Sequence, residues 1–343
     1  MVRAELRDFS ADSWHGVVSD FPNFTLAQTW EYAQAKVLTG SWKARRLVFI
    51  EGSRIVAAAQ AIVRLVPKFD KGLVWINGGP LGEFSSANDA LFLSVMEKLK
   101  GYWVDQKRMY LRLALPWPAQ EVDFSKLRSL GYESTDCSGW ASIRLDLSLP
   151  LDQLRSQLQQ KWRNCLNKSE RLGIEEHIGF DPATMSAFAE KHQRMLEERK
   201  FDTTITPDLI ATLQGMLPSD RKLLVFLGKH NGQAVGGVLI ARYGKICEYL
   251  AGVMDNAGRS VNVGHFLLWR AICEMKNRGY RWFDLGGADT ERSPAGILHF
   301  KMGCGGTAYR FANELEACSG AVLSRLVRWQ VRRARSKAGG PSA

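Results

Sequence analysis

The sequence predicts two tandem α/β units, each built as a mixed β-sheet with helices packed against it. The length of 343 residues exceeds what one hydrophobic core usually supports. The composition, 45% hydrophobic and 24% charged, is that of a globular chain that buries a substantial core. The third observation is a series of predicted elements that occurs twice in the same order.

Periodicity and turn residues define both copies of this repeat. The first copy has predicted strands at 47–50, 55–65 and 73–76, a helix at 90–100 and a strand at 108–113. The second copy has predicted strands at 223–227, 234–243 and 246–251, a helix at 265–277 and a strand at 280–285. A hairpin followed by a helix and a returning strand forms a mixed sheet, so each copy predicts one α/β unit. A chance coincidence of common elements is the alternative.

The segment between the two copies contains the expected domain boundary. A strand-like segment ends near Leu147, which places the first domain at 1–147 and the second at 148–307. The segment 308–343 could complete the first domain. Within the second domain, helices are predicted at 152–172, where the helix is basic and ends at Gly173, at 182–199 and at 207–216.

Several classes of protein are disfavoured by the sequence. The first residues mix acids with bases and lack a signal-peptide core, and no segment approaches about 20 uninterrupted apolar residues. We therefore expect a soluble, cytoplasmic protein. The six cysteines are scattered singly, without the close pairs of a zinc or dithiol site, so we expect reduced, mostly buried thiols and no metal.

The net charge of +11 favours a polyanionic partner, such as tRNA, a nucleotide-linked substrate or an anionic membrane surface. The tail 325–337 carries six bases and no acid, interleaved with apolar residues, and resembles a basic amphipathic helix that ends near 339–341. Peripheral contact with an anionic membrane and a solvated helix without a ligand are both compatible with this pattern.

Five motifs together resemble a known family. The residues that carry the resemblance lie at 25–36 with Trp42, at 77–80 (Asn-Gly-Gly-Pro), at 160–173, at 284–287 (Asp-Leu-Gly-Gly) and at 296–306, which includes Phe-Lys-Met-Gly-Cys-Gly-Gly. They are similar to the motifs of the Fem family of tRNA-dependent peptidoglycan aminoacyltransferases, within the GNAT superfamily. The last two motifs are the most specific, and the likeness extends from about residue 22 to 316.

The resemblance implies a fold, a reaction and several site residues. It implies two tandem GNAT-like acyltransferase domains, an aminoacyl-tRNA donor, and an amine acceptor on a nucleotide-sugar or lipid-linked cell-wall precursor peptide. It places Phe300 and Lys301 at the reaction centre, and it matches Lys36 to a lysine that helps to hold the precursor. We also expect Trp30, in the same motif as Lys36, to bind substrate.

This sequence departs from the family at the acceptor pocket. An arginine and a tyrosine that bind the soluble nucleotide-sugar pentapeptide correspond here to Ile205 and Leu209. The acceptor is therefore expected to be lipid-linked or different from peptidoglycan. The helical arm of some members is also absent, which assigns tRNA contact to the body of the protein.

The chemistry of acyl transfer suits the residues of the last motif. The transfer passes through a tetrahedral oxyanion, which Lys301 can stabilise as a point charge within a glycine-dense loop. In this loop Gly303 and Gly305 allow close backbone approach and positive φ, and they are expected to contact substrate. A solvent-facing Lys301 beside a hairpin turn is the alternative. Cys304 is expected to be inert, because a covalent role would need a base such as His299 to lower its pKa.

Four further residues are candidates at the site. Asp284, Asp289 and Glu291 could each act as the base, although Asp284 could instead fix its loop by accepting backbone N–H groups. Tyr249 could line the pocket or pack within its strand.

The donor has a second candidate. Acetyltransferases that use coenzyme A hold its pyrophosphate on a glycine-rich loop at a helix N-terminus. The segment 259–264 keeps one of those glycines and has Asn262 in place of another. An acyl-coenzyme A transferase acting in exopolysaccharide or cell-envelope modification is therefore one alternative. A non-catalytic RNA- or anion-binding scaffold is the other.

Overall fold

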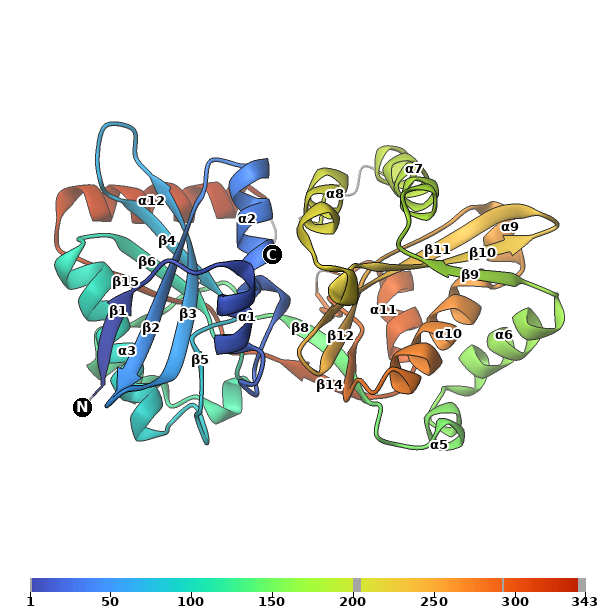
Figure 1. Ribbon diagram of the computed structural model, residues 1–343, viewed down its shortest axis with the longest axis horizontal. Helices are drawn as coiled ribbons and strands as arrows, with labels where there is room; N and C mark the ends of the chain where they lie inside the picture. The colour runs from blue at the N-terminus through green and yellow to red at the C-terminus, as the bar shows by residue number, and fades with distance from the viewer. Residues whose placement is uncertain (1, 200–204, 292, 339–343) are drawn as a thin grey trace. The chain divides into compact units, whose positions relative to one another are not determined.

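A computed structural model describes residues 2–199, 205–291 and 293–338 (Figure 1). It separates into two compact units. Unit 1 comprises the residues up to Trp140 and those from Arg310 onward, and unit 2 comprises Ala141–Tyr309. The expected boundary after Leu147 is thus too late, because β8 (Ala141–Asp146) pairs with β13 (Trp282–Asp284) and belongs to the second sheet.

Unit 1 contains an eight-stranded sheet in the order β1-β2-β3-β4-β6-β15-β7, with β5 paired to β3. Its strands are β1 (Arg3–Leu6), β2 (Lys43–Glu51), β3 (Arg54–Leu65), β4 (Gly72–Asn77), β5 (Leu81–Gly82), β6 (Tyr110–Ala114), β7 (Glu133–Ser134) and β15 (Leu315–Cys318). Its helices are α1 (Ala11–Val18), α2 (Trp30–Thr39), α3 (Ala90–Lys100), α4 (Phe124–Ser129) and α12 (Val322–Ala338). The expected end of α12 at 339–341 lies outside the described residues.

Unit 2 contains a seven-stranded sheet in the order β14-β8-β13-β12-β11-β10-β9. Its other strands are β9 (Glu175–Gly179), β10 (Leu224–His230), β11 (Gln233–Tyr243), β12 (Ile246–Met254) and β14 (Thr307–Arg310). Its helices are α5 (Leu151–Ser156), α6 (Gln160–Arg171), α7 (Pro182–Arg199), α8 (Pro207–Met216), α9 (Asn256–Ser260), α10 (Val263–Asn277) and α11 (Ala295–Met302).

The predicted repeat is confirmed by the topology of the two sheets. In unit 1 three antiparallel strands lead through α3 into β6, which pairs in parallel with β4. In unit 2 the same order leads through α10 into β13, which pairs in parallel with β12. Each returning strand then gains an antiparallel neighbour from elsewhere in the chain, β15 for β6 and β8 for β13.

The single helix expected at 152–172 is two helices, α5 and α6. The break results from a contact with a distant segment, because the Gln159 N–H donates to the Gly303 carbonyl (3.0 Å) instead of continuing a helical ladder. Trp162 and Leu166 then point into the second core from α6. The start of α6 is therefore fixed to the segment that carries the last sequence motif.

The described residues contain neither a membrane-spanning helix nor a metal-binding cluster. No helix among them is long and apolar enough to cross a bilayer. No group of three or more histidine, cysteine or acidic side chains in the described ranges could hold a metal ion. The six cysteines are free, but the expectation that most are buried is wrong, since Cys247 and Cys304 are buried and the other four are partly exposed.

Candidate functional site

Lys301 is buried in unit 2, with 7% of its surface exposed, so the solvent-facing alternative is wrong. It lies in the last turn of α11 rather than in the glycine loop, which begins two residues later. Its Nζ donates to the Gly287 carbonyl at 2.9 Å and lies 5.3 Å from the centroid of the Tyr249 ring. The ammonium group is thereby held beside the carboxyl end of β13 and next to Tyr249 in the middle of β12.

Two carboxylates on these strands attract the ammonium group of Lys301. Glu248 of β12 and Asp284 of β13 are paired in register. Burial lowers the pKa of Lys301 to about 8, against the attraction of Asp284 and Glu248. Burial and the charge of Asp284 raise the pKa of Glu248 to about 7, and Glu248 accepts a hydrogen bond from the Tyr243 hydroxyl (2.6 Å). The site therefore holds an acid and a base that both titrate near neutral pH.

Glu248 is the functional candidate that the sequence analysis missed. It lies in an otherwise apolar strand segment, Ile246-Cys-Glu-Tyr-Leu-Ala251. An acid inside such a strand is unusual, because burying an unpaired charge is unfavourable. A single acid within an apolar strand was therefore the sequence signal that could have identified Glu248 as a site residue.

Asp284 is held by three hydrogen-bond donors and one ion pair. Its carboxylate accepts from the Ser142 hydroxyl (2.5 Å), from the Tyr309 hydroxyl (2.5 Å) and from the Gly286 N–H (2.9 Å), and it lies 3.5 Å from Arg144 Nε. A carboxylate with these partners is fixed in place. The geometry favours Asp284 as the residue that orders the loop after β13, with Lys301 attached to the same loop through Gly287.

The other two predicted bases lie in that loop. Asp289 is buried and accepts from the Glu291 N–H (2.8 Å), which is the geometry of a turn-stabilising carboxylate. Glu291 is exposed.

Phe300 is part of an aromatic cluster behind Lys301. The centroid of its ring lies 6.0 Å from the centroid of the Trp162 ring and 5.1 Å from that of His265. The centroids of the Trp162 and His265 rings are 4.9 Å apart. The Trp162 indole donates to the Phe300 carbonyl (3.0 Å). Burial lowers the pKa of His265 to about 4, so the imidazole is neutral at physiological pH. The cluster joins α6, α10 and α11 and fixes the helix that carries Lys301.

The glycines of the last motif face protein rather than an open site. Gly303 has a helical φ of −67°, contrary to the expected positive φ, and a Cβ there would lie 2.7 Å from Trp162 Cδ1. Gly305 has the expected positive φ of 81°, and a Cβ there would lie 2.9 Å from the Gln157 carbonyl oxygen. These positions therefore allow the turn after α11 to approach α5 and α6 closely.

Tyr249 follows the last paired residue of β12 against β13. A Cβ at Gly252 would lie 1.9 Å from its hydroxyl oxygen, so the ring extends along its own strand over this glycine. Burial raises the pKa of Tyr249, which keeps the hydroxyl protonated. Both expected roles are visible, since Tyr249 packs along the strand and also contacts the Lys301 ammonium group.

Cys304 is fully buried in the second core. Burial raises the pKa of its thiol, and His299 is exposed on α11. A buried neutral thiol is a poor nucleophile, so the geometry favours the inert role.

Lys36 and Trp30 lie in unit 1, on α2, whereas the other predicted site residues lie together in unit 2. Burial lowers the pKa of Lys36, whose Nζ lies 5.5 Å from the Tyr32 ring. Trp30 donates from its indole to the Phe9 carbonyl (2.8 Å), and its ring lies 5.3 Å from the Arg46 guanidinium. A half-buried lysine suits an anionic substrate. The contacts of Trp30 are with other residues of unit 1, which indicates a role in packing.

At the predicted acceptor positions, Leu209 is buried in α8 and Ile205 is partly buried. Both lie close to the start of α8. The apolar Leu209 thus contributes to packing rather than to a charged pocket.

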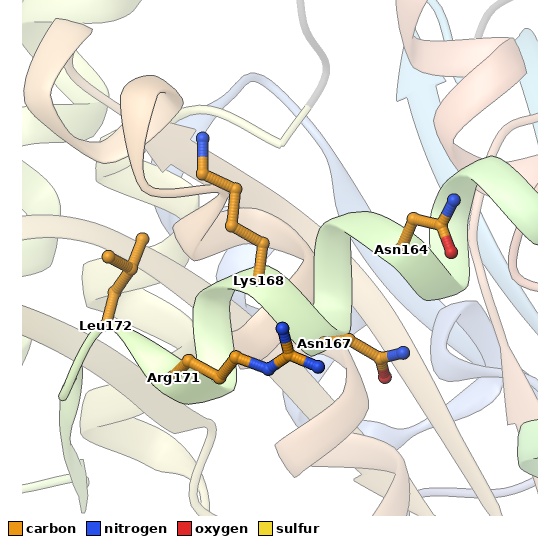
Figure 2. A pocket seen from close by; sticks show the side chains of 5 residues that line it. All are labelled: Asn164, Asn167, Lys168, Arg171 and Leu172. Carbon is orange, nitrogen blue, oxygen red and sulfur yellow. The ribbon is translucent and has the colours of Figure 1, made fainter.

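A surface hollow lies along the exposed side of α6 (Figure 2). It is lined by Asn164, Asn167, Lys168, Arg171 and Leu172, whose side chains extend from this helix and its end. The acid of the helix, Glu170, is paired with Arg155 (2.6 Å). Lys168 and Arg171 are exposed and have no ion pair within the described part of the chain. The hollow therefore presents cations and amides, which suit an anionic, hydrogen-bonding ligand.

The possible coenzyme A segment forms a short helix, α9, and the start of α10. Asn262 adopts a left-handed conformation (φ 57°) directly before α10. The methyl carbon of Met254 would lie 2.6 Å from a Cβ at Gly264, so this side chain covers the first turn of α10.

Comparison with known proteins agrees with this geometry. A family model described as an acetyltransferase (GNAT) domain matches residues 155–302, which include α6, Glu248 and Lys301. The lipid II:glycine glycyltransferase of Staphylococcus saprophyticus is 29% identical over 186 residues, which are 51% of this chain and 42% of that protein. The chain thus spans less than half the length of this relative.

Two solved structures share the fold. The crystal structure of FemX matches with a TM-score of 0.81 and 17% identity, covering 94% of this chain and 99% of that one. A tandem GNAT protein from the clavulanic acid biosynthesis pathway matches with a TM-score of 0.51 and 13% identity, covering 92% and 98%. Two GNAT-like units in one chain are therefore the architecture of this protein.

Proposed function

We propose that the chain is a Fem-type acyltransferase that transfers an aminoacyl group from aminoacyl-tRNA to an amine of a peptidoglycan or related peptide precursor. The match to a GNAT domain, the similarity to a lipid II:glycine glycyltransferase and the fold shared with FemX support this proposal. The observation that carries this proposal is the buried ammonium group of Lys301, held between the Gly287 carbonyl and the Tyr249 ring. Such a cation in a site of low dielectric is suited to stabilise developing negative charge.

The proposed reaction assigns a role to each group around Lys301. The acceptor amine attacks the ester carbonyl of the donor, a C–N bond forms, and Lys301 stabilises the oxyanion. Glu248 accepts the proton that the amine loses. The C–O bond to the ribose then breaks as the oxyanion collapses, and the ribose oxygen leaves as a hydroxyl with the proton that Glu248 took from the amine. Asp284 and Trp162 act indirectly, because they position the loop and the helix that hold Lys301.

The pKa values of the two central groups predict a bell-shaped pH dependence. Glu248 must be ionised to accept a proton, so the rate rises with pH through about 7. Lys301 must be charged to stabilise the oxyanion, so the rate falls as pH rises through about 8. We expect Glu248→Gln to lower the maximal rate about 10²–10⁴-fold and to remove the acidic limb of the profile of kcat/KM. An unchanged acidic limb in Glu248→Gln would exclude Glu248 as the base.

The exposed side of α6 supports an RNA donor. Lys161, Lys168 and Arg171 are exposed on a helix whose opposite side, through Trp162, packs on Phe300 of the candidate site. At about 1.5 Å per residue they extend over about 15 Å, enough to contact several successive phosphates.

A charge-removal experiment tests this RNA contact. We expect the double variant Lys168→Ala/Arg171→Ala to weaken tRNA binding and to reduce the slope of log affinity against log salt by about two. Lys245→Ala is the matched control, because Lys245 is exposed on unit 2 and has no ion pair in the described residues. Equal slopes for all three proteins would place the RNA elsewhere.

An acyl-coenzyme A donor is the second candidate. It is favoured by the match to a GNAT domain and by the N-terminus of α10, the kind of position at which coenzyme A enzymes hold the pyrophosphate. Purified full-length chain is incubated with lipid II and either radiolabelled glycyl-tRNA, a mixture of all charged tRNAs, or radiolabelled acetyl-coenzyme A. Label that reaches the lipid II peptide from a charged tRNA is the expected result. Label that arrives from acetyl-coenzyme A alone would replace the proposal by the second candidate.

A further inference from the structure

Helix α12 in unit 1 exposes a row of large apolar side chains to solvent. Val322, Leu326 and Trp329 have 74%, 51% and 54% of their surface exposed. Their spacing of four and three residues places them on one side of the helix, here called the outer row. An exposed row of this kind in a polar helix is a feature of interaction surfaces.

The opposite side of α12 is fixed to the first sheet. The helix packs on β4, β6 and β15, with Ser324 and Val327 buried. Arg328 pairs with Glu133 and Glu316, and Arg332 pairs with Glu316. These ion pairs orient the helix, so the outer row cannot turn inward without breaking them.

Cations flank the outer row. Arg325 is exposed one position before Leu326, and the Arg333 guanidinium lies 5.1 Å from the Trp329 ring. The sequence of α12 contains no acid. Aliphatic side chains, an indole ring and arginines on one helix side match the boundary between the headgroups and acyl chains of an anionic bilayer.

We propose that the outer row of α12 binds the surface of an anionic membrane, with Trp329 and Leu326 inserted at the headgroup level. A second copy of the chain fits the row less well, because three side chains cannot supply the roughly 1,200–2,000 Å² that a stable interface buries. The arginines beside the row also complement lipid phosphates rather than an identical basic helix. The inference goes beyond the transfer reaction, because a chain that transferred nothing could still bind vesicles.

Vesicle co-sedimentation of the full-length chain tests the proposal. We expect binding to vesicles of phosphatidylglycerol and phosphatidylcholine, and little binding to phosphatidylcholine alone. The variant Leu326→Ser/Trp329→Ser should lose about tenfold or more in partitioning, and Arg325→Gln about fivefold on the anionic vesicles. Phe69→Ser is the matched control, because Phe69 is 57% exposed in the same unit but outside α12, and it should bind like the unaltered chain.

Circular dichroism and thermal melting verify that each variant is folded. Equal binding by the unaltered chain and by the folded Leu326→Ser/Trp329→Ser variant would overturn the proposal. A chain that ignores both kinds of vesicle would also overturn it, as would a dimer, measured by light scattering, that dissociates in this variant while vesicle binding is absent.

Discussion

Lys301→Met is expected to lower turnover about 10²–10³-fold, the loss typical of removing one preorganised donor from an oxyanion site, or about 3–4 kcal/mol. Methionine keeps the apolar stem and removes the charge that Asp284 and Glu248 attract. Label transfer from charged tRNA to lipid II, measured under single-turnover conditions, provides the rate. Because the oxyanion forms only during the transfer, the affinity for charged tRNA should change little.

The folded state should tolerate this substitution. Lys301 is buried with a lowered pKa, so its loss removes a desolvated charge while leaving the Gly287 carbonyl without its donor. These effects oppose each other, and each is on the order of 1–3 kcal/mol. Lys245→Met, an exposed lysine of the same unit, is the matched control and should retain full turnover. Full activity in Lys301→Met would remove Lys301 from the reaction.

Glu314→Ala is expected to destabilise unit 1 by about 3–5 kcal/mol, the largest effect on folding that we predict. Glu314 directly precedes β15 and forms an ion pair with Arg112 of β6, and their side chains are 4% and 1% exposed. Removing the carboxylate leaves a buried guanidinium without its counter-charge. The shift of the urea midpoint of unit 1 provides the measurement.

Two further variants separate this loss from a general effect of removing an ion pair. Asp105→Ala breaks the exposed pair with Lys100 (3.0 Å) in the same unit and should cost less than about 1 kcal/mol. The double variant Arg112→Met/Glu314→Leu removes both charges and should recover most of the lost stability. If Glu314→Ala shifted the midpoint no more than Asp105→Ala does, the segment from Arg310 onward would not be integral to unit 1.

Helices and turns whose signals lie within a few neighbouring residues were predicted correctly from the sequence. The helices at 182–199 and 207–216 were predicted with the bounds of α7 and α8, because proline at the start and apolar periodicity are local signals. The predicted strands at 223–227 and 234–243 are joined by a tight hairpin, in which Asn231 and Gly232 both have the positive φ that the turn requires.

The errors arose where distant segments determine structure. Nothing in the residues of β8 indicates that they pair with β13, more than 130 positions later, so the domain boundary was placed too late. The break between α5 and α6 depends on the Gly303 carbonyl, again far along the chain.

The candidate site was predicted in part for the same reason. Lys301 and Phe300 follow from a motif, but the burial of Lys301 depends on α6 and on the loop after β13. Glu248 had no motif, and its raised pKa results from burial and from Asp284 on the neighbouring strand. Such a pairing across a sheet cannot be read from either strand alone.

The most direct measurement of the central claim is an NMR titration of the Lys301 ammonium group, with ¹³Cε-labelled lysine and assignment by Lys301→Arg. We predict a pKa of about 8 for Lys301. We also predict that this resonance shifts when a non-hydrolysable 3′-aminoacylamino adenosine is added and does not shift on addition of coenzyme A. A pKa near the usual 10.5 for lysine, in a resonance that the adenosine analogue leaves unmoved, would contradict the central claim.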